Sequence, residues 1–183
     1  MLEDHETWFF WLRKNHATSS GVWLRIAKKS AKLRSVSYPQ AVDAALCFGW
    51  IDGQKMGAGG NYWLQRFTPR SRKSIWSKIN REKAIRLIEL GQMNAAGLRE
   101  VDRARRNGRW DGAYDSPSGA TISADFQAVL NKTPRAKAFF ATLDRRNRYA
   151  VLFRIQTAKR AETRAKRIKQ FAEMLSQHEK IYP

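Results

Sequence analysis

Residues 50–68 contain two strand-like runs joined by a glycine-rich turn, and this pattern constrains the fold more than any other part of the sequence. The runs Trp50–Met56 and Tyr62–Phe67 contain branched and aromatic residues, and Gly57–Asn61 lies between them. This arrangement is typical of a β-hairpin. A third short run of the same kind, Val22–Ile26, precedes the hairpin. The sequence therefore predicts a small antiparallel sheet of about three strands.

Apolar residues recur at helical spacing in most of the remaining chain, which predicts helices around and after this sheet. The fold class expected is therefore α+β, with an all-helical C-terminal unit. Capping residues predict helix starts after Asp4, after Ser37 with Pro39 in the first turn, and after Ser74. Further helices are expected over about 95–107, 125–130, 134–143 and 146–177.

Residues 111–121 form a natural boundary, because glycine, proline, aspartate and serine gather there. We expect an α+β body over residues 1–110, a linker over 111–121, and a helical module over 122–183. The longest predicted helix, 146–177, carries apolar residues at spacings of three, four or seven, with basic residues on its other sides.

The charge of the chain indicates an anionic partner. Its 183 residues include 35 Lys and Arg against 16 Asp and Glu, for a net charge of +19. The net charge rises from +3 over residues 1–60 to +9 over residues 121–183. A hydrophobic fraction of 43% with 7 Trp supports a folded core. The high charge therefore indicates anionic partners and not a disordered chain.

The last predicted helix presents a row of arginines. Arg160, Arg164 and Arg167 stand at positions i, i+4 and i+7, so three guanidinium groups would lie along about 10 Å of one side. Guanidinium donors match phosphate oxygens, and such contacts weaken steeply with salt. The alternative is a solvated helix face whose charges bind nothing.

Aromatic and basic residues also alternate at the exit of the hairpin. Arg70, Arg72 and Lys73 lie between the aromatic residues Phe67 and Trp76. Aromatic faces stack on bases while basic groups neutralise the backbone, a combination typical of single-strand binding without sequence preference. The six basic residues predicted to bind nucleic acid or another anion are Arg70, Arg72, Lys73, Arg160, Arg164 and Arg167.

The same region has a second interpretation. Its aromatic residues could fill the core while Asp52 pairs with Arg66 or Arg70 across the hairpin. If that pair is buried, it could frame a pocket for a small ligand or a protein partner. The pocket residues would be Trp50, Asp52, Gly53, Arg66, Trp76 and Asn80.

Other chemistry has weak support in the sequence. Cys47 is the one cysteine, so an internal disulfide and a cysteine-based zinc site are excluded. The three histidines have no metal-ligand spacing, and Gly57–Gly60 lacks the Gly-Lys-Ser/Thr ending of a phosphate loop. Spacing reveals no catalytic triad. We therefore expect a non-enzymatic protein without a metal or cofactor.

The sequence predicts neither a transmembrane segment nor a signal peptide. No apolar run approaches the roughly 18–20 residues that cross a bilayer, and Asp4 and Glu6 lie where a signal peptide has a basic start and an apolar middle. A cytoplasmic location is the expectation.

Several motifs resemble the YdeI/OmpD-associated, or bacteriocin-protection, family. The longest are the run Cys-Phe-Gly-Trp-Ile-Asp-Gly at 47–53 and the run Ala-Lys-Arg-Ala-Glu-Thr-Arg at 158–164. Shorter matches are Gly21–Leu24, Phe67–Arg70, Ser74–Ser77 and Gly108–Trp110. The motif positions that the resemblance singles out are Trp50, Asp52, Gly53, Arg70, Trp76, Asn80, Glu162 and Arg164.

The resemblance implies a role in bacterial stress or antimicrobial resistance and an indirect link to a porin, but no reaction. Taken with the charge, it leads to the expectation of a binder of anionic partners, with nucleic acid first. The alternative is a small-ligand or protein-interaction module that uses the aromatic, Asp and Arg pocket.

Overall fold

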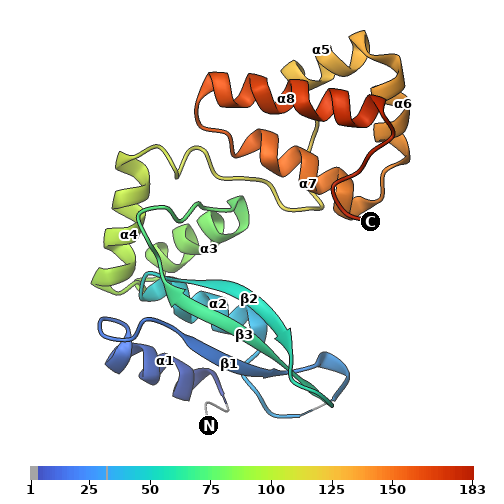
Figure 1. Cartoon of the computed structure of the whole chain (residues 1–183). Helices are drawn as coiled ribbons and strands as arrows, with labels where there is room; N and C mark the ends of the chain where they lie inside the picture. Colours follow the sequence, from blue (N-terminus) through green and yellow to red (C-terminus); the bar gives the residue numbers. More distant parts are fainter. Residues whose placement is uncertain (1–3, 32) are drawn as a thin grey trace. The chain divides into compact units, whose positions relative to one another are not determined.

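The computed structural model describes residues 4–31 and 33–183, and the chain divides into two compact units, Met1–Asp111 and Gly112–Pro183. The prediction of an α+β fold with a three-stranded antiparallel sheet and a helical C-terminal part is confirmed. The elements are α1 (His5–Asn15), β1 (Val22–Ala27), the short 3-10 helix η1 (Lys29–Ala31), α2 (Tyr38–Cys47), β2 (Trp50–Gly57), β3 (Tyr62–Pro69), α3 (Lys78–Glu89) and α4 (Ala95–Arg106), followed in the second unit by α5 (Ala124–Lys132), α6 (Pro134–Thr142), α7 (Arg145–Gln156) and α8 (Ala161–Ser176) (Figure 1).

Two capping boxes fix the starts of α1 and α2. The carboxylate of Asp4 accepts the backbone N–H of Thr7 at 2.9 Å, and the Thr7 hydroxyl accepts the N–H of Asp4 in return. Ser37 and Gln40 make the same reciprocal pair before α2. Each box satisfies helix N–H groups that otherwise lack partners. Both starts agree with the sequence.

The sheet has the strand order β1-β3-β2, and both outer strands run antiparallel to β3. Successive side chains of a strand point to opposite faces, so the register decides which residues share a face. Leu24 and Ile26 are buried, and they pair with Gln65 and Trp63 of β3. These residues define the inner face of the sheet.

Helices α1 and α2 cover the inner face. The Trp8 ring of α1 lies 5.3 Å from the Phe67 ring, and Trp8 Nε1 donates to the carbonyl of Ala41 in α2 at 3.1 Å. Trp8 and Phe67 are fully buried. In Figure 1, α2 lies behind β2 and β3. Trp8 therefore belongs to the core of the N-terminal unit.

Helix α3 begins later than predicted. Ser77, not Ser74, is the N-cap, and its hydroxyl accepts the backbone N–H of Asn80 at 3.1 Å. The residues before it are held in a loop, because Arg103 of α4 donates to the carbonyl of Ser71 at 2.7 Å. A tertiary contact therefore overrides the local capping signal at Ser74.

Helix α4 crosses the end of α2 at a glycine. A Cβ built on Gly97 would lie 2.7 Å from the carbonyl oxygen of Leu46 and closer still to that of Cys47. Only a residue without a side chain fits this approach. Gly49, with φ +73°, turns the chain from α2 into β2 beside the same crossing.

The C-terminal unit has its own core, in which Phe126 of α5 and Phe140 of α6 pack edge to face with their ring centroids 5.5 Å apart. Helices α7 and α8 complete it with further apolar side chains. The fully or nearly fully buried members are Phe126, Leu130, Ala136, Phe140, Val151, Leu152, Ile155, Ile168 and Leu175.

The prediction of one helix over 146–177 is wrong, because α7 ends at Gln156 and α8 begins at Ala161. The return of the chain brings Ile168 and Leu175 of α8 into the core of the unit. A straight helix would carry this apolar stripe away from the core. Arg164 and Arg167 donate to the carbonyls of Ile155 and Arg154, so side chains of α8 satisfy the end of α7.

Candidate nucleic-acid interface

The outer face of the sheet combines aromatic and basic side chains. Trp23 and Arg25 alternate with the buried Leu24 and Ile26 of β1, so they point to the opposite face. Trp23 pairs with Arg66 of β3, which therefore shares that face. By the same register, the outer face contains Trp23, Arg25, Ile51, Met56, Tyr62, Leu64, Arg66 and Thr68, all exposed or half-buried.

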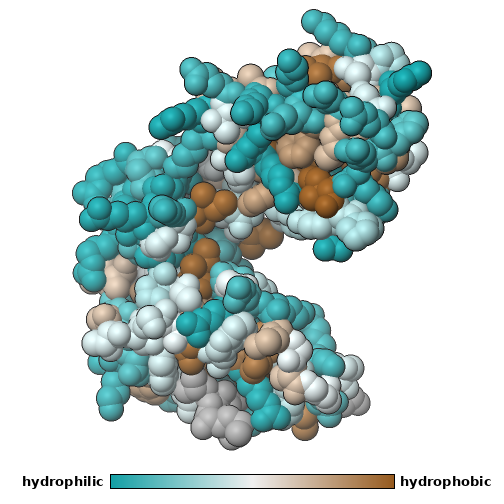
Figure 2. Space-filling view, in the orientation of Figure 1, coloured by the Kyte–Doolittle hydropathy of each residue, from teal (hydrophilic) through white to brown (hydrophobic). Residues whose placement is uncertain are grey.

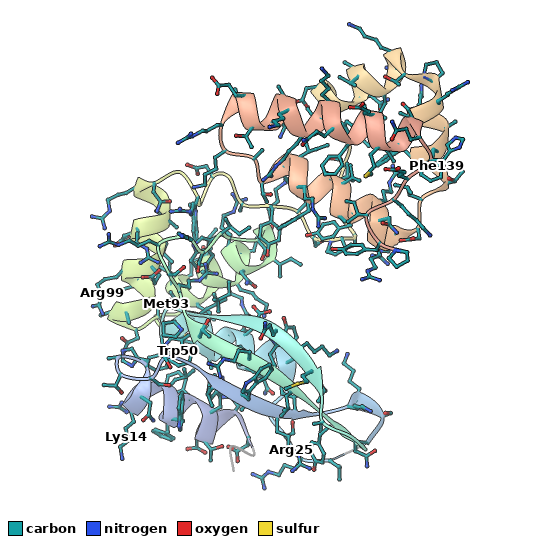
Figure 3. The ribbon with its side chains drawn as sticks, in the orientation of Figure 1. Lys14, Arg25, Trp50, Met93, Arg99 and Phe139 are labelled. Atoms are coloured by element: carbon teal, nitrogen blue, oxygen red, sulfur yellow. The ribbon has the colours of Figure 1, made fainter. Side chains whose placement is uncertain are left out.

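Two cation–π pairs organise this outer face. The Arg25 guanidinium carbon lies 3.7 Å from the ring centroid of Tyr62, and that of Arg66 lies 5.7 Å from the ring centroid of Trp23. The quadrupole of an aromatic ring attracts a cation at such distances. Figure 3 shows Arg25 on β1 at the outside of the N-terminal unit, and in Figure 2 white and brown residues mix with teal ones over this unit. The face thus presents flat rings with positive charge fixed beside them.

Gly21 makes room for one of these arginines. A Cβ at Gly21 would lie 2.8 Å from Nη2 of Arg66 and 2.8 Å from Cγ2 of Thr68. Its φ of +143° also favours glycine. The residue before β1 therefore helps to place the Arg66 guanidinium against the sheet.

The hairpin tip adds a basic cavity of about 490 Å³. Lys28 Nζ donates to the carbonyl of Gly60 at 2.7 Å, and Lys55 Nζ lies 4.3 Å from the ring centroid of Trp63. Lys29 and Tyr62 also line the cavity, and none of the described residues that line it is acidic. The tip is thus a second positive surface on the same unit.

Of the predicted anion-binding residues, Arg70 lies inside the N-terminal unit. It is 6% exposed, stacks on Trp76 with its guanidinium carbon 3.6 Å from the ring centroid, and donates to the carbonyl of Ile75 at 3.3 Å. With Trp50 and Glu100, it lines a cavity of about 300 Å³. Burial raises the pKa of the Glu100 carboxyl, and the charges of Arg103 and Arg70 oppose that shift.

Arg72 and Lys73 are exposed in the loop that Ser71 and Ser74 organise. The hydroxyl of Ser71 accepts the backbone N–H of Lys73 at 3.2 Å, and that of Ser74 accepts the N–H of Ser71 at 3.0 Å. The exposed side chains of Arg72 and Lys73 are available to a polyanion.

The arginine row of α8 is divided among three environments. Arg160 is exposed and stands at the N-cap position, outside the helix. Arg164 makes a two-pronged ion pair with Asp125, with N–O distances of 2.6 and 2.9 Å, which holds the pKa of that carboxyl far below its usual range. Arg167 donates to the carbonyl of Arg154. Two of the three guanidinium groups thus join parts of the C-terminal unit.

The residues predicted to form a pocket have separate surroundings. Trp50 is buried against Trp11, and Trp76 is buried edge to face with Trp110. The carboxylate of Asp52 accepts a hydrogen bond from the Tyr38 hydroxyl at 2.7 Å. The Gly53 carbonyl accepts from Gln65 Nε2 at 2.9 Å, Asn80 lies in the first turn of α3, and Arg66 belongs to the outer face of the sheet.

The sequence prediction of the site did not include Trp23 and Arg25. The signal that could have found them is alternation, because the sequence Val22–Ile26 places Trp23 and Arg25 on one face of the predicted strand. Which face is exposed depends on where the helices pack, and the local sequence does not specify that.

Among residues 4–31 and 33–183, no group of three or more His, Cys, Asp or Glu side chains could hold a metal ion. Across the same described ranges, no helix has the length and hydropathy needed to span a membrane.

The fold and the site define a two-unit α+β protein with an aromatic and basic sheet face and a helical C-terminal unit. By its match over residues 1–100, the chain belongs to the family described as the domain of unknown function DUF8412. Residues 120–178 match OmdA, the family described as bacteriocin-protection, YdeI or OmpD-associated, which confirms the predicted resemblance for the C-terminal unit. No curated protein and no solved structure matches the chain.

Proposed function

We propose that the protein binds single-stranded nucleic acid, without catalysis, through the outer face of its sheet. The observation that supports this most is the pairing of Arg25 with Tyr62 and of Arg66 with Trp23 on one open face. Bases stack on aromatic rings, while neighbouring cations neutralise phosphates. Lys28, Lys29 and Lys55 at the hairpin tip add a second positive surface to the same unit.

Single strands fit this face better than duplex DNA does. Stacking on Trp23 and Tyr62 requires unpaired bases, because a duplex hides the faces of its bases. The net charge of +19 adds a general attraction to any polyanion. The proposal therefore predicts binding to both forms at low salt, with a preference for single strands that persists as salt rises.

The test is a fluorescence-anisotropy titration of labelled single-stranded and duplex DNA at salt concentrations from about 50 to 200 mM. We expect micromolar binding of the single strand at the lowest salt and a linear fall of log affinity with log salt. Tyr62→Ala removes one stacking ring and should weaken single-strand binding about tenfold, with less effect on duplex.

Arg66→Gln and Arg13→Gln form a matched pair of charge changes in the same unit. Arg66 lies on the outer face, whereas Arg13 is exposed on α1. Arg66→Gln should weaken binding severalfold and reduce the salt slope, while Arg13→Gln should stay within twofold of the unchanged protein. Equal effects of the two changes, or no detectable binding at tens of micromolar protein, would overturn the proposal.

A further inference from the structure

The C-terminal unit has a cavity of about 620 Å³ whose charged lining is entirely arginine. Arg145, Arg146 and Arg154 of α7 line it, and none of the eight described lining residues is acidic. Ligand pockets for small molecules fall in this range of volume. Three positive charges without a carboxylate in the lining favour an anionic ligand.

Aromatic rings form the other walls of this cavity. Tyr149 and Phe153 lie one turn apart on α7 with ring centroids 5.7 Å apart, and Tyr182 faces them from the C-terminal segment. The Tyr149 hydroxyl donates to the carbonyl of Asp115 at 3.0 Å, which fixes that ring. Burial raises the pKa of Tyr149 to about 12, so the phenol stays neutral. Flat walls of this kind suit a planar ring.

Tyr182 is held against the arginines. The Arg146 guanidinium carbon lies 4.0 Å from its ring centroid, and a hydrogen bond from Arg154 together with the charge of that residue lowers the pKa of the Tyr182 phenol. The lowered pKa has the sign expected for a positive electrostatic potential. Aromatic and cationic groups thus meet in one place.

A buried asparagine holds the Tyr182 segment in position. Asn147 is 1% exposed, its Oδ1 accepts the backbone N–H of Tyr182 at 2.9 Å, and its Nδ2 donates to the carbonyl of Tyr182 at 3.2 Å. Asp144 accepts a further bond from the same amide at 2.8 Å. Because these contacts order the Tyr182 segment without a ligand, binding would cost little conformational entropy.

We propose that this cavity binds a mononucleotide, as a planar base carrying a phosphate group. The base would stack on the rings of Tyr149, Phe153 or Tyr182, and the phosphate would accept hydrogen bonds from the guanidinium groups of Arg145 and Arg146. The site lies in the C-terminal unit and does not depend on the sheet.

The experiment is an isothermal titration of the full chain with adenosine 5′-monophosphate, with adenosine and inorganic phosphate as separate probes. We expect the nucleotide to bind with a dissociation constant below about 1 mM and each part alone to bind at least tenfold more weakly. Phosphate binding as tight as the nucleotide, adenosine binding as tight as the nucleotide, or no binding of the nucleotide would each overturn the proposal.

Variants locate the binding. Arg146→Gln should weaken nucleotide binding at least fivefold, whereas Arg135→Gln, a matched change at an exposed position of α6, should leave it within twofold. Tyr182→Leu should weaken it and Tyr182→Phe should retain it. If Tyr182→Leu loses its helical circular dichroism, Arg145→Gln at an exposed position serves in its place. Equal effects of Arg146→Gln and Arg135→Gln would overturn the proposal.

Changes on the sheet separate this site from the single-strand interface. Tyr62→Ala and Arg66→Gln should leave nucleotide binding within twofold of the unchanged protein. If these changes abolish nucleotide binding, the nucleotide binds at the sheet and the cavity assignment fails while the single-strand proposal stands.

Discussion

Arg164 illustrates how one residue of a basic surface can serve the fold. Its side chain forms the ion pair with Asp125 of α5 and also donates to the carbonyl of Ile155 at 3.0 Å. It therefore joins α5, α7 and α8, and only about a quarter of its side chain is exposed. The sequence shows the positive charge at this position, but it does not predict the partner, because Asp125 lies 39 residues away along the chain.

The ion pair predicts a dependence of stability on pH. Arg164 lowers the pKa of the Asp125 carboxyl, so this carboxyl takes up a proton at a higher pH in the unfolded chain than in the folded one. Its contribution is complete above about pH 5 and is lost as the pH falls below about 4 toward the folded-state pKa. At pH 7, Asp125→Asn should lower the free energy of unfolding by about 1 kcal/mol.

Urea unfolding followed by circular dichroism measures this effect. The difference in the free energy of unfolding between the unchanged protein and Asp125→Asn should become smaller as the pH falls from 5 toward 2. Glu179→Gln, which removes the same charge at an exposed position, serves as the control. A difference that stays constant with pH would contradict the stabilising role of the ion pair between Arg164 and Asp125.

At the scale of elements, the sequence predicts helices and strands from capping and periodicity, but it does not predict how they cross. The starts of α1 and α2 follow from the capping residues Asp4 and Ser37, and β1 follows from the Val22–Ile26 pattern. The break between α7 and α8 contains no glycine or proline that would predict it. It lets the apolar side of α8 pack in the core of the C-terminal unit. Such a break depends on tertiary packing, which a local pattern does not contain.

The crossing of α2 and α4 gives a prediction at this scale. Gly97→Ala usually stabilises a helix by about 1 kcal/mol, but here the new methyl group would meet the carbonyls of Leu46 and Cys47. We expect a loss of about 2 kcal/mol or more in the free energy of unfolding of the N-terminal unit. Tryptophan fluorescence reports this unit alone, because all 7 Trp lie within residues 8–110.

Gly57→Ala is the control for that change. No heavy atom lies within 4 Å of a Cβ at Gly57, and its φ is not in the left-handed region. Its effect should stay below about 0.5 kcal/mol. A stabilised Gly97→Ala variant would show that α4 lies farther from α2 than described.

At the scale of the whole molecule, net charge alone does not identify the binding surface. The charge of +19 is readable from the sequence, yet Arg70, Arg164 and Arg167 turn out to hold the fold together. The outer sheet face emerges only from the strand register and from the side on which α1 and α2 pack. The candidate site was thus predictable in its chemistry, aromatic and basic, but only partly in its residues.

The most direct test is a nitrogen-15 NMR titration of the tryptophan indole signals with single-stranded DNA. Trp23 lies on the outer face, whereas Trp8 and Trp50 are buried and donate their indole N–H groups to backbone carbonyls. We predict a large shift at Trp23 that is lost at high salt, with Trp8 and Trp50 unchanged. An unmoved Trp23 signal under conditions in which the strand binds would contradict the assignment of the interface to this face.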